Sequence, residues 1–329
     1  MKKIVSLIVL LSVIISLNAQ DVHFSQYYTQ PLNLNPATTG FYKGDFRLTT
    51  VYKDQWKSIK APYSSYNVSG DMRIIKQRGI RNIIGLGMYA LSDKSGDGDY
   101  KTSQFGFAFS YLKNFDHFGV QYLGGGISAG YTSTIVNYDN FRFEDAFLSS
   151  GPTQEPGSNT ANYFDVNMGV FYSYALDQMW SVEGGAAVFH LNEPSNSFFG
   201  NSDSKVYRKY VFHASGNYLL NTRMDFYPKV AVFLQGPHKE IDLGGFMRIR
   251  LDNMRTSKYG LYAGCWYRVG DALIPTVRFD LYLLSFAFSY DVNISKLKDA
   301  SKGIGGPEFS LIFITKYKHK SPGAFFPRF

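Results

Sequence analysis

The side chains that could hold a metal ion or move a proton are six histidines and many carboxylates, spread over 329 residues. No two histidines stand four residues apart, as metal-binding histidines on one helical face do. Carboxylates are too numerous for an acid–base pair to be chosen without its geometry. We therefore expect no catalytic residue, no metal ligand and no cofactor. The histidines are His23, His117, His190, His213, His238 and His319.

Two glycine-containing stretches partly match known ligand-binding loops. DKSGDGDY, residues 93–100, matches the first half of a calcium loop. Gln104 stands where a bidentate Glu would close that loop, so a solvated loop is the favoured interpretation. GGGISAG, residues 124–130, has the glycine content of a dinucleotide fingerprint, but it lies inside a predicted strand and opens no helix. Neither stretch predicts a ligand.

Alternation of apolar with small or polar residues is the dominant pattern of the chain. In QFGFAFSYLK, residues 104–113, aromatic side chains alternate with Gly, Ala and Ser. The same pattern recurs in DVNMGVFYSYA at 165–175 and in LLSFAFSYDVN at 283–293. A period of two predicts strands with one apolar face and one small or polar face.

About fourteen such strands can be marked, and most have about ten or more residues, the length of a tilted strand that spans a bilayer. Strands of a soluble β-sandwich are usually nearer five or six residues. The connections also alternate loosely between short turns and longer loops, as in outer-membrane barrels. The predicted strands are 46–58, 63–75, 82–93, 100–113, 117–134, 160–175, 178–190, 207–221, 223–235, 240–252, 257–268, 272–280, 283–293 and 306–317.

These patterns predict an all-β fold, a transmembrane antiparallel β-barrel of about fourteen strands with a short N-terminal plug-like segment. An even strand number places both ends of the barrel in the periplasm. Aromatic residues near strand ends, Tyr52 and Trp56 and then Tyr259, Tyr262 and Trp266, fit interfacial girdles.

The first residues have the pattern of a Sec signal peptide. Lys2 and Lys3 precede an apolar run, and the small residue Ala19 stands at the expected cleavage site. No later apolar run is long enough for a transmembrane helix. The formal charge is +8 with the basic residues scattered, which argues against a nucleic-acid partner.

Residues 24–40, FSQYYTQPLNLNPATTG, fit neither a long helix nor a strand. Asn35 as a cap, Pro36 at the first helical position and Gly40 as a stop predict one short helical turn that includes Ala37. Aromatic residues before it, Tyr27 and Tyr28 among them, require burial. A barrel of about fourteen strands is too wide for its own side chains to fill. We therefore expect this segment to be a plug or a lid on the periplasmic mouth.

The stretches FSQYYTQPLNLNPATTGFY and DFRLTTVYKDQW resemble the start of the PorP/SprF family of type IX secretion outer-membrane proteins of Bacteroidetes. DALIPTVRFDLYLLSFAFSYDVNISKLKDASKGIGGPEFSLIF is similar to the end of the family's barrel. The resemblance implies a role in secreting or anchoring a specific cell-surface adhesin of the gliding type. The implied partners are a secreted adhesin with a type IX sorting domain, other type IX components and outer-membrane lipid.

These observations divide the chain into a signal peptide (1–19), a plug or periplasmic-mouth segment (20–45), the barrel (46–317) and a periplasmic tail (318–329). The loops near 135–159 and 191–206 are predicted to bind the partner, because aromatic anchors with a polar rim are a common interface composition. Two alternatives stay open: a transporter for hydrophobic small molecules, which also uses a plugged barrel with an Asn-Pro-Ala turn, and an open porin. The proposed loop anchors are Phe141, Phe143, Phe147, Phe198 and Phe199.

Overall fold

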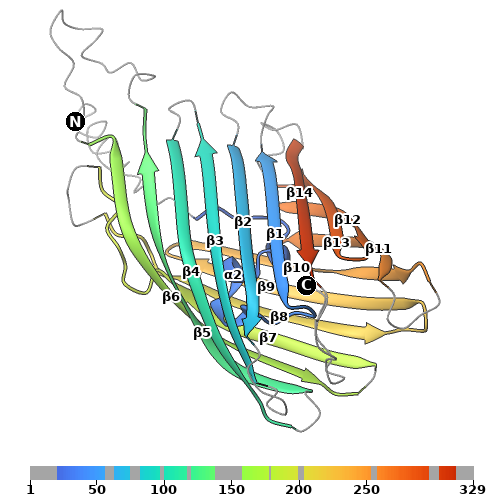
Figure 1. The fold of residues 1–329 in the computed structure, drawn as a ribbon. Helices are drawn as coiled ribbons and strands as arrows, with labels where there is room; N and C mark the ends of the chain where they lie inside the picture. The colour runs from blue at the N-terminus through green and yellow to red at the C-terminus, as the bar shows by residue number, and fades with distance from the viewer. Residues whose placement is uncertain are drawn as a thin grey trace, which may run out of the picture.

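The structure, a computed structural model, describes residues 21–55, 63–74, 82–96, 100–116, 120–137, 158–177, 179–198, 204–252, 258–295 and 304–315. They form fourteen antiparallel strands that close into one barrel (Figure 1). The strands are β1 (Phe46–Gln55), β2 (Tyr63–Ile74), β3 (Ile83–Ser95), β4 (Tyr100–Asn114), β5 (Gln121–Ile135), β6 (Thr160–Ala175), β7 (Trp180–Phe189), β8 (Lys209–Leu219), β9 (Met224–Gln235), β10 (His238–Arg250), β11 (Tyr259–Arg268), β12 (Ala272–Leu281), β13 (Leu284–Asn293) and β14 (Ile304–Ile314).

Closure comes from the pairing of the first strand with the last. Val51 of β1 faces Ser310 of β14, and on its other side β1 pairs with β2. Every remaining strand pairs with its sequence neighbours. The predicted closed barrel is confirmed, and the alternating pattern located each strand within a few residues.

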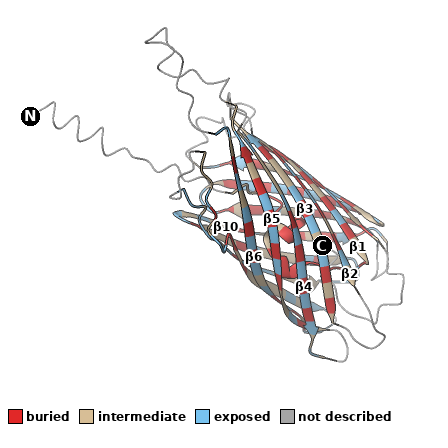
Figure 2. Ribbon diagram, turned by 60° about the vertical axis from the view of Figure 1, so that its left-hand side comes forward, coloured by how far each residue is buried: buried red, intermediate tan, exposed pale blue. Residues whose placement is uncertain are grey.

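Buried and exposed residues alternate along the strands (Figure 2), and the exposed, outward residues are mostly apolar whereas many of the buried, inward ones are polar. On β4, Phe105, Phe107 and Phe109 are 47%, 56% and 43% exposed, whereas Ser110 is fully buried. Apolar side chains in this exposed position are stable when lipid, rather than water, surrounds the barrel. Among the described residues, no helix has the length and hydropathy of a membrane span.

The predicted aromatic girdle is wrong for two residues of β11. Tyr262 and Trp266 are buried in the interior, whereas Tyr259 is exposed on the outer face. Tyr262 and Trp266 share the inward parity of Arg268, and Tyr259 stands on the opposite parity. Position near a strand end therefore does not place an aromatic residue at the membrane interface unless its parity also points outward.

The two ends of the barrel differ in their connections. Connections after odd-numbered strands lie at one end, here named the loop end, which is uppermost in Figure 1. It includes the long connections between Ile135 and Thr160 and between Phe189 and Lys209. The opposite turn end holds short connections, and β1 begins and β14 finishes there. In an outer-membrane barrel the loop end faces the outside of the cell.

Before β1, the chain runs inside the ring of strands (Figure 1). It forms three short helical pieces, η1 (Tyr27–Thr29), α2 (Pro31–Leu34) and η2 (Pro36–Thr38). Residues 21–44 are named here the lumen segment. Asp21 lies beside the loop-end residues Lys209 and Gln235, whereas Gly40 lies beside Asp71 near the turn end of β2. The lumen segment therefore runs lengthwise through the barrel.

Candidate functional site

The candidate site is the lumen segment together with the inward side chains that hold it. Its first attachment is Asp21 at the loop end. The Asp21 backbone N–H donates to Gln235 Oε1 at 3.1 Å, and Gln235 Nε2 donates back to Asp21 Oδ1 at 3.1 Å. Lys209 Nζ lies 3.4 Å from Asp21 Oδ2. Two strands, β8 and β9, thus contact the same residue of the lumen segment.

His190, directly after β7, completes this attachment. Its Nε2 lies 2.9 Å from Asp21 Oδ2, and its Nδ1 lies 3.0 Å from Asp165 Oδ1. Burial opposes the charge on the ring, but the two carboxylates raise the pKa of His190 to about 10. Burial also opposes the charge of Asp21, but His190 and Lys209 hold its pKa well below the usual range. The contact is therefore a charged pair at neutral pH.

The second attachment is a buried carboxylate, Glu308 of β14. Its two oxygens accept hydrogen bonds from the backbone N–H groups of Ser25 at 2.7 Å and Gln26 at 2.8 Å. The Gln26 amide in turn donates to Ser289 Oγ and accepts from Ser310 Oγ. Such charge-assisted bonds fix both the position and the direction of the segment.

Charged side chains from three further strands surround Ser25. Its hydroxyl donates to Asp291 Oδ2 of β13 at 2.7 Å. Lys53 Nζ of β1 and Arg268 Nη2 of β11 each lie 3.2 Å from Ser25 Oγ. Lys53 and Arg268 also pair with Asp291, at 3.5 and 3.4 Å. Because buried charges are stable only when paired, this cluster depends on all its members.

Aromatic packing holds the middle of the segment. Tyr28 stacks on Trp266 with a centroid distance of 4.8 Å and meets Phe246 edge-on at 5.4 Å. Tyr27 lies edge-on to Phe233 at 5.9 Å. The wall here is β9 to β12, and the two adjacent tyrosines form one hydrophobic cluster with the inward residues of these strands.

The predicted Asn-Pro-Ala turn is confirmed as η2. Asn35 caps it, with its Oδ1 accepting from the Ala37 N–H at 2.9 Å and Pro36 at the first helical position. Asn35 Nδ2 donates to the Val170 carbonyl of β6 at 2.9 Å. A Cβ added at Gly169 would lie 2.0 Å from Asn35 Oδ1. The turn therefore packs directly against the backbone of β6 at Gly169, where there is no side chain.

The segment is fixed again near the turn end. Gly40, with φ +74°, donates its N–H to Asp71 Oδ2 at 2.7 Å. Arg73 donates to the carbonyls of Gly40 at 3.0 Å and Tyr42 at 2.6 Å. Arg47 forms a double hydrogen bond with Asp71 at 2.9 and 2.8 Å. The backbone turn that ends the segment is thus held by paired charges of β1 and β2.

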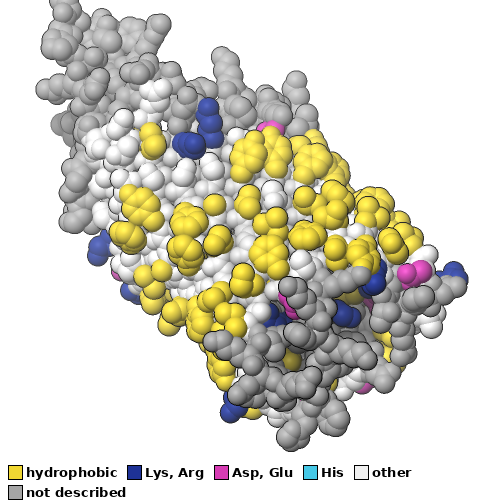
Figure 3. All heavy atoms as spheres, in the orientation of Figure 1, with side chains coloured by type: hydrophobic (Ala, Val, Ile, Leu, Met, Phe, Trp, Pro, Cys, Tyr) yellow, Lys and Arg dark blue, Asp and Glu magenta, His cyan; other side chains and the backbone are white. Residues whose placement is uncertain are grey.

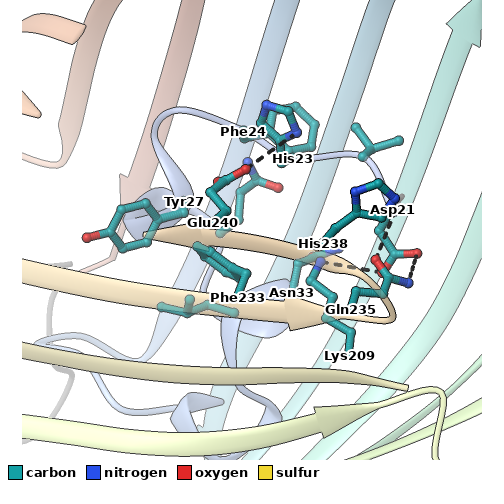
Figure 4. Close-up of a pocket in the computed structure, with 13 residues that line it drawn as sticks. Asp21, His23, Phe24, Tyr27, Asn33, Lys209, Phe233, Gln235, His238 and Glu240 are labelled. Atoms are coloured by element: carbon teal, nitrogen blue, oxygen red, sulfur yellow. Dashed lines mark hydrogen bonds and ion pairs between the residues drawn. The ribbon is translucent and has the colours of Figure 1, made fainter. Parts of the chain in front are cut away.

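A pocket of about 70 Å³ opens between the lumen segment and β8 to β10 (Figure 4). Figure 4 shows Lys209 and Gln235 directed toward Asp21, and His23 directed toward Glu240. Phe233 and Leu34 provide apolar walls. Gln30 also lines the pocket, and its buried Nε2 has no hydrogen-bond partner among the described residues. The pocket therefore combines an apolar wall with the Gln30 amide, which could donate a hydrogen bond to a ligand.

The predicted site residues fall into two groups. Tyr27, Tyr28, Asn35, Pro36 and Ala37 all lie buried in the lumen segment, as described above. Phe198 is the one predicted loop anchor within the described residues. Its carbonyl accepts from the Ser158 N–H at 2.9 Å, and its ring lies edge-on to Tyr100 at 6.4 Å. The other anchors, Phe141, Phe143, Phe147 and Phe199, lie outside the described residues.

The sequence interpretation missed the charged residues that hold the segment. Except for His190, which directly follows β7, they occupy inward positions of strands whose outward positions are apolar, as Glu308 does beside Phe309. A charge on the inward parity of a predicted strand is the signal that could have identified them. The described residues contain no group of three His, Cys, Asp or Glu side chains that could hold a metal. The residues missed are Lys53, Asp71, His190, Arg268, Asp291 and Glu308.

Several solved structures are similar to this barrel in fold. A Pseudomonas aeruginosa FadL homologue is 13% identical, with a TM-score of 0.51 over 84% of this chain and 91% of that one. The Pseudomonas putida toluene transporter TodX is 10% identical, with a TM-score of 0.51 over 87% and 93%. The CymD monoaromatic hydrocarbon channel is 10% identical, with a TM-score of 0.50 over 88% and 94%. At this identity the likeness shows the fold alone.

Among curated proteins, no sequence matches this chain. A family model, described as type IX secretion system membrane protein PorP/SprF, matches residues 16–305. The match covers most of the barrel and the whole lumen segment. The resemblance to that family is therefore confirmed, and the chain belongs to the PorP/SprF family of type IX secretion system outer-membrane proteins.

Proposed function

We propose that this barrel works by binding rather than by conduction or catalysis, and that it docks a secreted adhesin at the cell surface. The observation that carries the proposal is the lumen segment, which is fixed to the wall at Asp21, at Ser25 and at Gly40. A barrel whose interior is tied to its wall along its length has little room for a water channel. Its available surfaces are then its outer face and its two ends.

The loop end is the surface that a partner arriving outside the cell would meet. Its long connections, 135–159 and 191–206, carry the phenylalanines proposed as anchors. Phe198 supports this assignment because its ring contacts Tyr100 of β4 and its carbonyl accepts from Ser158, two residues before β6. A rim fixed to long strands gives a partner a defined surface, and the type IX family supplies the class of partner: an adhesin with a type IX sorting domain.

The test is to shorten both long loops and to label the surface of whole cells. One adhesin should disappear from the surface while barrel abundance in the same membranes is unchanged. A matched control shortens the connection between β10 and β11, whose joined ends lie at the turn end, and should leave that adhesin in place. Normal surface adhesin after shortening both long loops would refute the docking site. Loss of many unrelated secreted proteins would indicate a general role in the translocon instead.

Transport of hydrophobic small molecules is the second candidate, and the pocket in Figure 4 favours it. Apolar walls from Phe233 and Leu34 at the loop end suit an apolar ligand entering from outside. Solved barrels of the same fold include a toluene transporter. Toluene binding to the purified barrel, weakened by Phe233→Ala, would support this candidate. If the barrel binds no toluene in toluene-saturated buffer, this candidate function is excluded.

A further inference from the structure

The outer face of β1 to β6 carries an apolar hollow of about 740 Å³. Small outward residues form its floor: Gly70 on β2, Ala90 on β3 and Ala129 on β5. Large outward side chains of the neighbouring positions also line the hollow. The hollow exists because the small side chains leave space on the outer face that large side chains would fill. Among the surrounding side chains are Leu48, Met72, Met88, Phe105, Phe107 and Ile127.

Two lysines lie beyond this hollow toward the loop end. Lys94 is four positions past Ala90 on β3, and Lys101 is four positions before Phe105 on β4. Lys94 of β3 and Lys101 of β4 are direct partners in the strand ladder. Both are exposed, and they share the outward parity of Met88 and Phe105. Figure 3 shows the same face of the barrel, with Lys or Arg side chains at the upper edge of the apolar belt. The barrel thus presents two adjacent cations outward, next to lipid.

The position of the lysines along the strand places them at the membrane interface. Lys101 and Tyr111 are both outward residues of β4, ten positions apart. That separation is about 33 Å along a strand and about 25 Å along the barrel axis at the usual tilt. The apolar band of outer-membrane barrels is about 25 Å tall. With Tyr111 at the inner interface, Lys101 and Lys94 lie where the phosphates of outer-leaflet lipids lie.

We propose that this face binds a phosphorylated lipid of the outer leaflet, with its phosphate at Lys94 and Lys101 and its acyl chains in the hollow. Free phosphate is a poorer fit, because exposed cations alone attract anions weakly at physiological salt. The hollow lies within the apolar belt, where an acyl chain can bury its methylene groups. The site goes beyond partner docking, since it lies on the wall rather than at the loops.

The test uses the purified full-length barrel in detergent and native mass spectrometry with diphosphorylated lipid A. One lipid should remain bound per barrel. The double variant Lys94→Gln/Lys101→Gln should weaken binding at least tenfold. Ala90→Leu fills the floor of the hollow from the lipid side and should also weaken it. The matched control is Lys113→Gln, which removes an outward lysine at the other end of the same strand and should have no effect.

Several outcomes would overturn the proposal. Equal binding of lipid A without its phosphates would show that the lysines do not recognise the head group. Displacement of the lipid by millimolar inorganic phosphate would show an anion site without a lipid component. Equal weakening by Lys113→Gln would reveal a general charge effect. Strand content measured by circular dichroism confirms that each variant is folded, so each loss can be assigned to the site.

Discussion

Ser25 and Glu308 stand 283 positions apart in sequence, yet the Ser25 N–H donates to the Glu308 carboxylate at 2.7 Å in the centre of the barrel. Glu308 belongs to β14, which closes the barrel against β1. The lumen segment is therefore tied to the seam where the first and last strands meet. The position of the lumen segment therefore depends on barrel closure. The segment in turn provides the N–H groups that pair with the Glu308 carboxylate at the seam.

Removing the Glu308 carboxylate should destabilise the barrel. Glu308→Ala leaves the N–H groups of Ser25 and Gln26 without their acceptor, at a cost of roughly 1–3 kcal/mol for each buried group. Glu308→Gln retains one acceptor oxygen and should cost less. Chemical unfolding followed by Trp fluorescence measures both variants, since Trp266 stacks on Tyr28 in the same lumen. The expected order of stability is wild type, Glu308→Gln, Glu308→Ala.

Glu193→Gln is the control for this comparison, because Glu193 is an exposed loop-end residue that pairs with Arg208 at 3.6 Å. Exposed pairs contribute about 0–1 kcal/mol, so this variant should unfold close to wild type. Equal stability of Glu308→Ala and Glu193→Gln would show that the segment is not held by the seam.

Deleting residues 24–40 should open the lumen. The deletion removes the tyrosines that pack against β9 to β12 and the turn that contacts β6. Buried charges such as Asp291 and Arg268 then face water, which can hydrate them. Conductance across planar bilayers should rise from nearly closed to a steady channel. A wild-type barrel that already conducts like a porin, or a deletion that stays closed, would contradict the plug.

The His190 contact predicts how stability depends on pH. The pKa of His190 is about 10 in the folded barrel, against about 6.5 when unfolded. The stabilisation is therefore complete below about pH 6.5 and is lost as the pH rises toward 10. The free energy of unfolding should fall by on the order of 1 kcal/mol per pH unit across this window. Asp21, whose pKa is lowered, acts in the opposite direction. Its stabilisation of the fold is lost only when the pH falls into the strongly acidic range.

His190→Gln should remove most of this slope, measured as urea unfolding at several pH values between 6 and 10. His238→Gln changes a histidine at the same end of the barrel, retains the Asp21–His190 pair, and should keep the slope. If wild type and His190→Gln change in parallel with pH, another group is responsible.

The strands could be predicted well because the alternation within each strand shows which of its residues face outward and which face inward. The alternation in residues 104–113 needs no knowledge of neighbours, and β4 has the expected outward residues. The Asn35 cap was equally local, since the Asn–Pro pair specifies its turn within four residues. Features encoded in a short window were therefore predictable.

Contacts across the lumen were not predictable in this way. The position of Trp266 near a strand end predicts an interfacial girdle, whereas its inward parity places it against Tyr28. The cluster around Ser25 combines β1, β11, β13 and β14, and no local pattern specifies which inward charges meet. Such pairs depend on closure and register, which involve the whole chain.

The last prediction concerns the contact between the Asn35 turn and the wall. A Cβ at Gly169 would lie 2.0 Å from Asn35 Oδ1, so Gly169→Ala must push the turn away from β6. We expect a loss of about 1–3 kcal/mol in unfolding free energy. Gly216→Ala is the matched control on β8, because its added Cβ would come no closer than 3.4 Å, to a Pro228 side-chain carbon.

A double-mutant cycle with Asn35→Ala separates this clash from a general effect of adding a methyl group to a strand. Asn35→Ala alone should cost about 1 kcal/mol through loss of the cap. In that background Gly169→Ala should cost clearly less than in wild type, because the atom it strikes is absent. Additive effects would mean that the turn does not press on the wall. Strong coupling would identify bare backbone at Gly169 as the surface on which the lumen segment is seated.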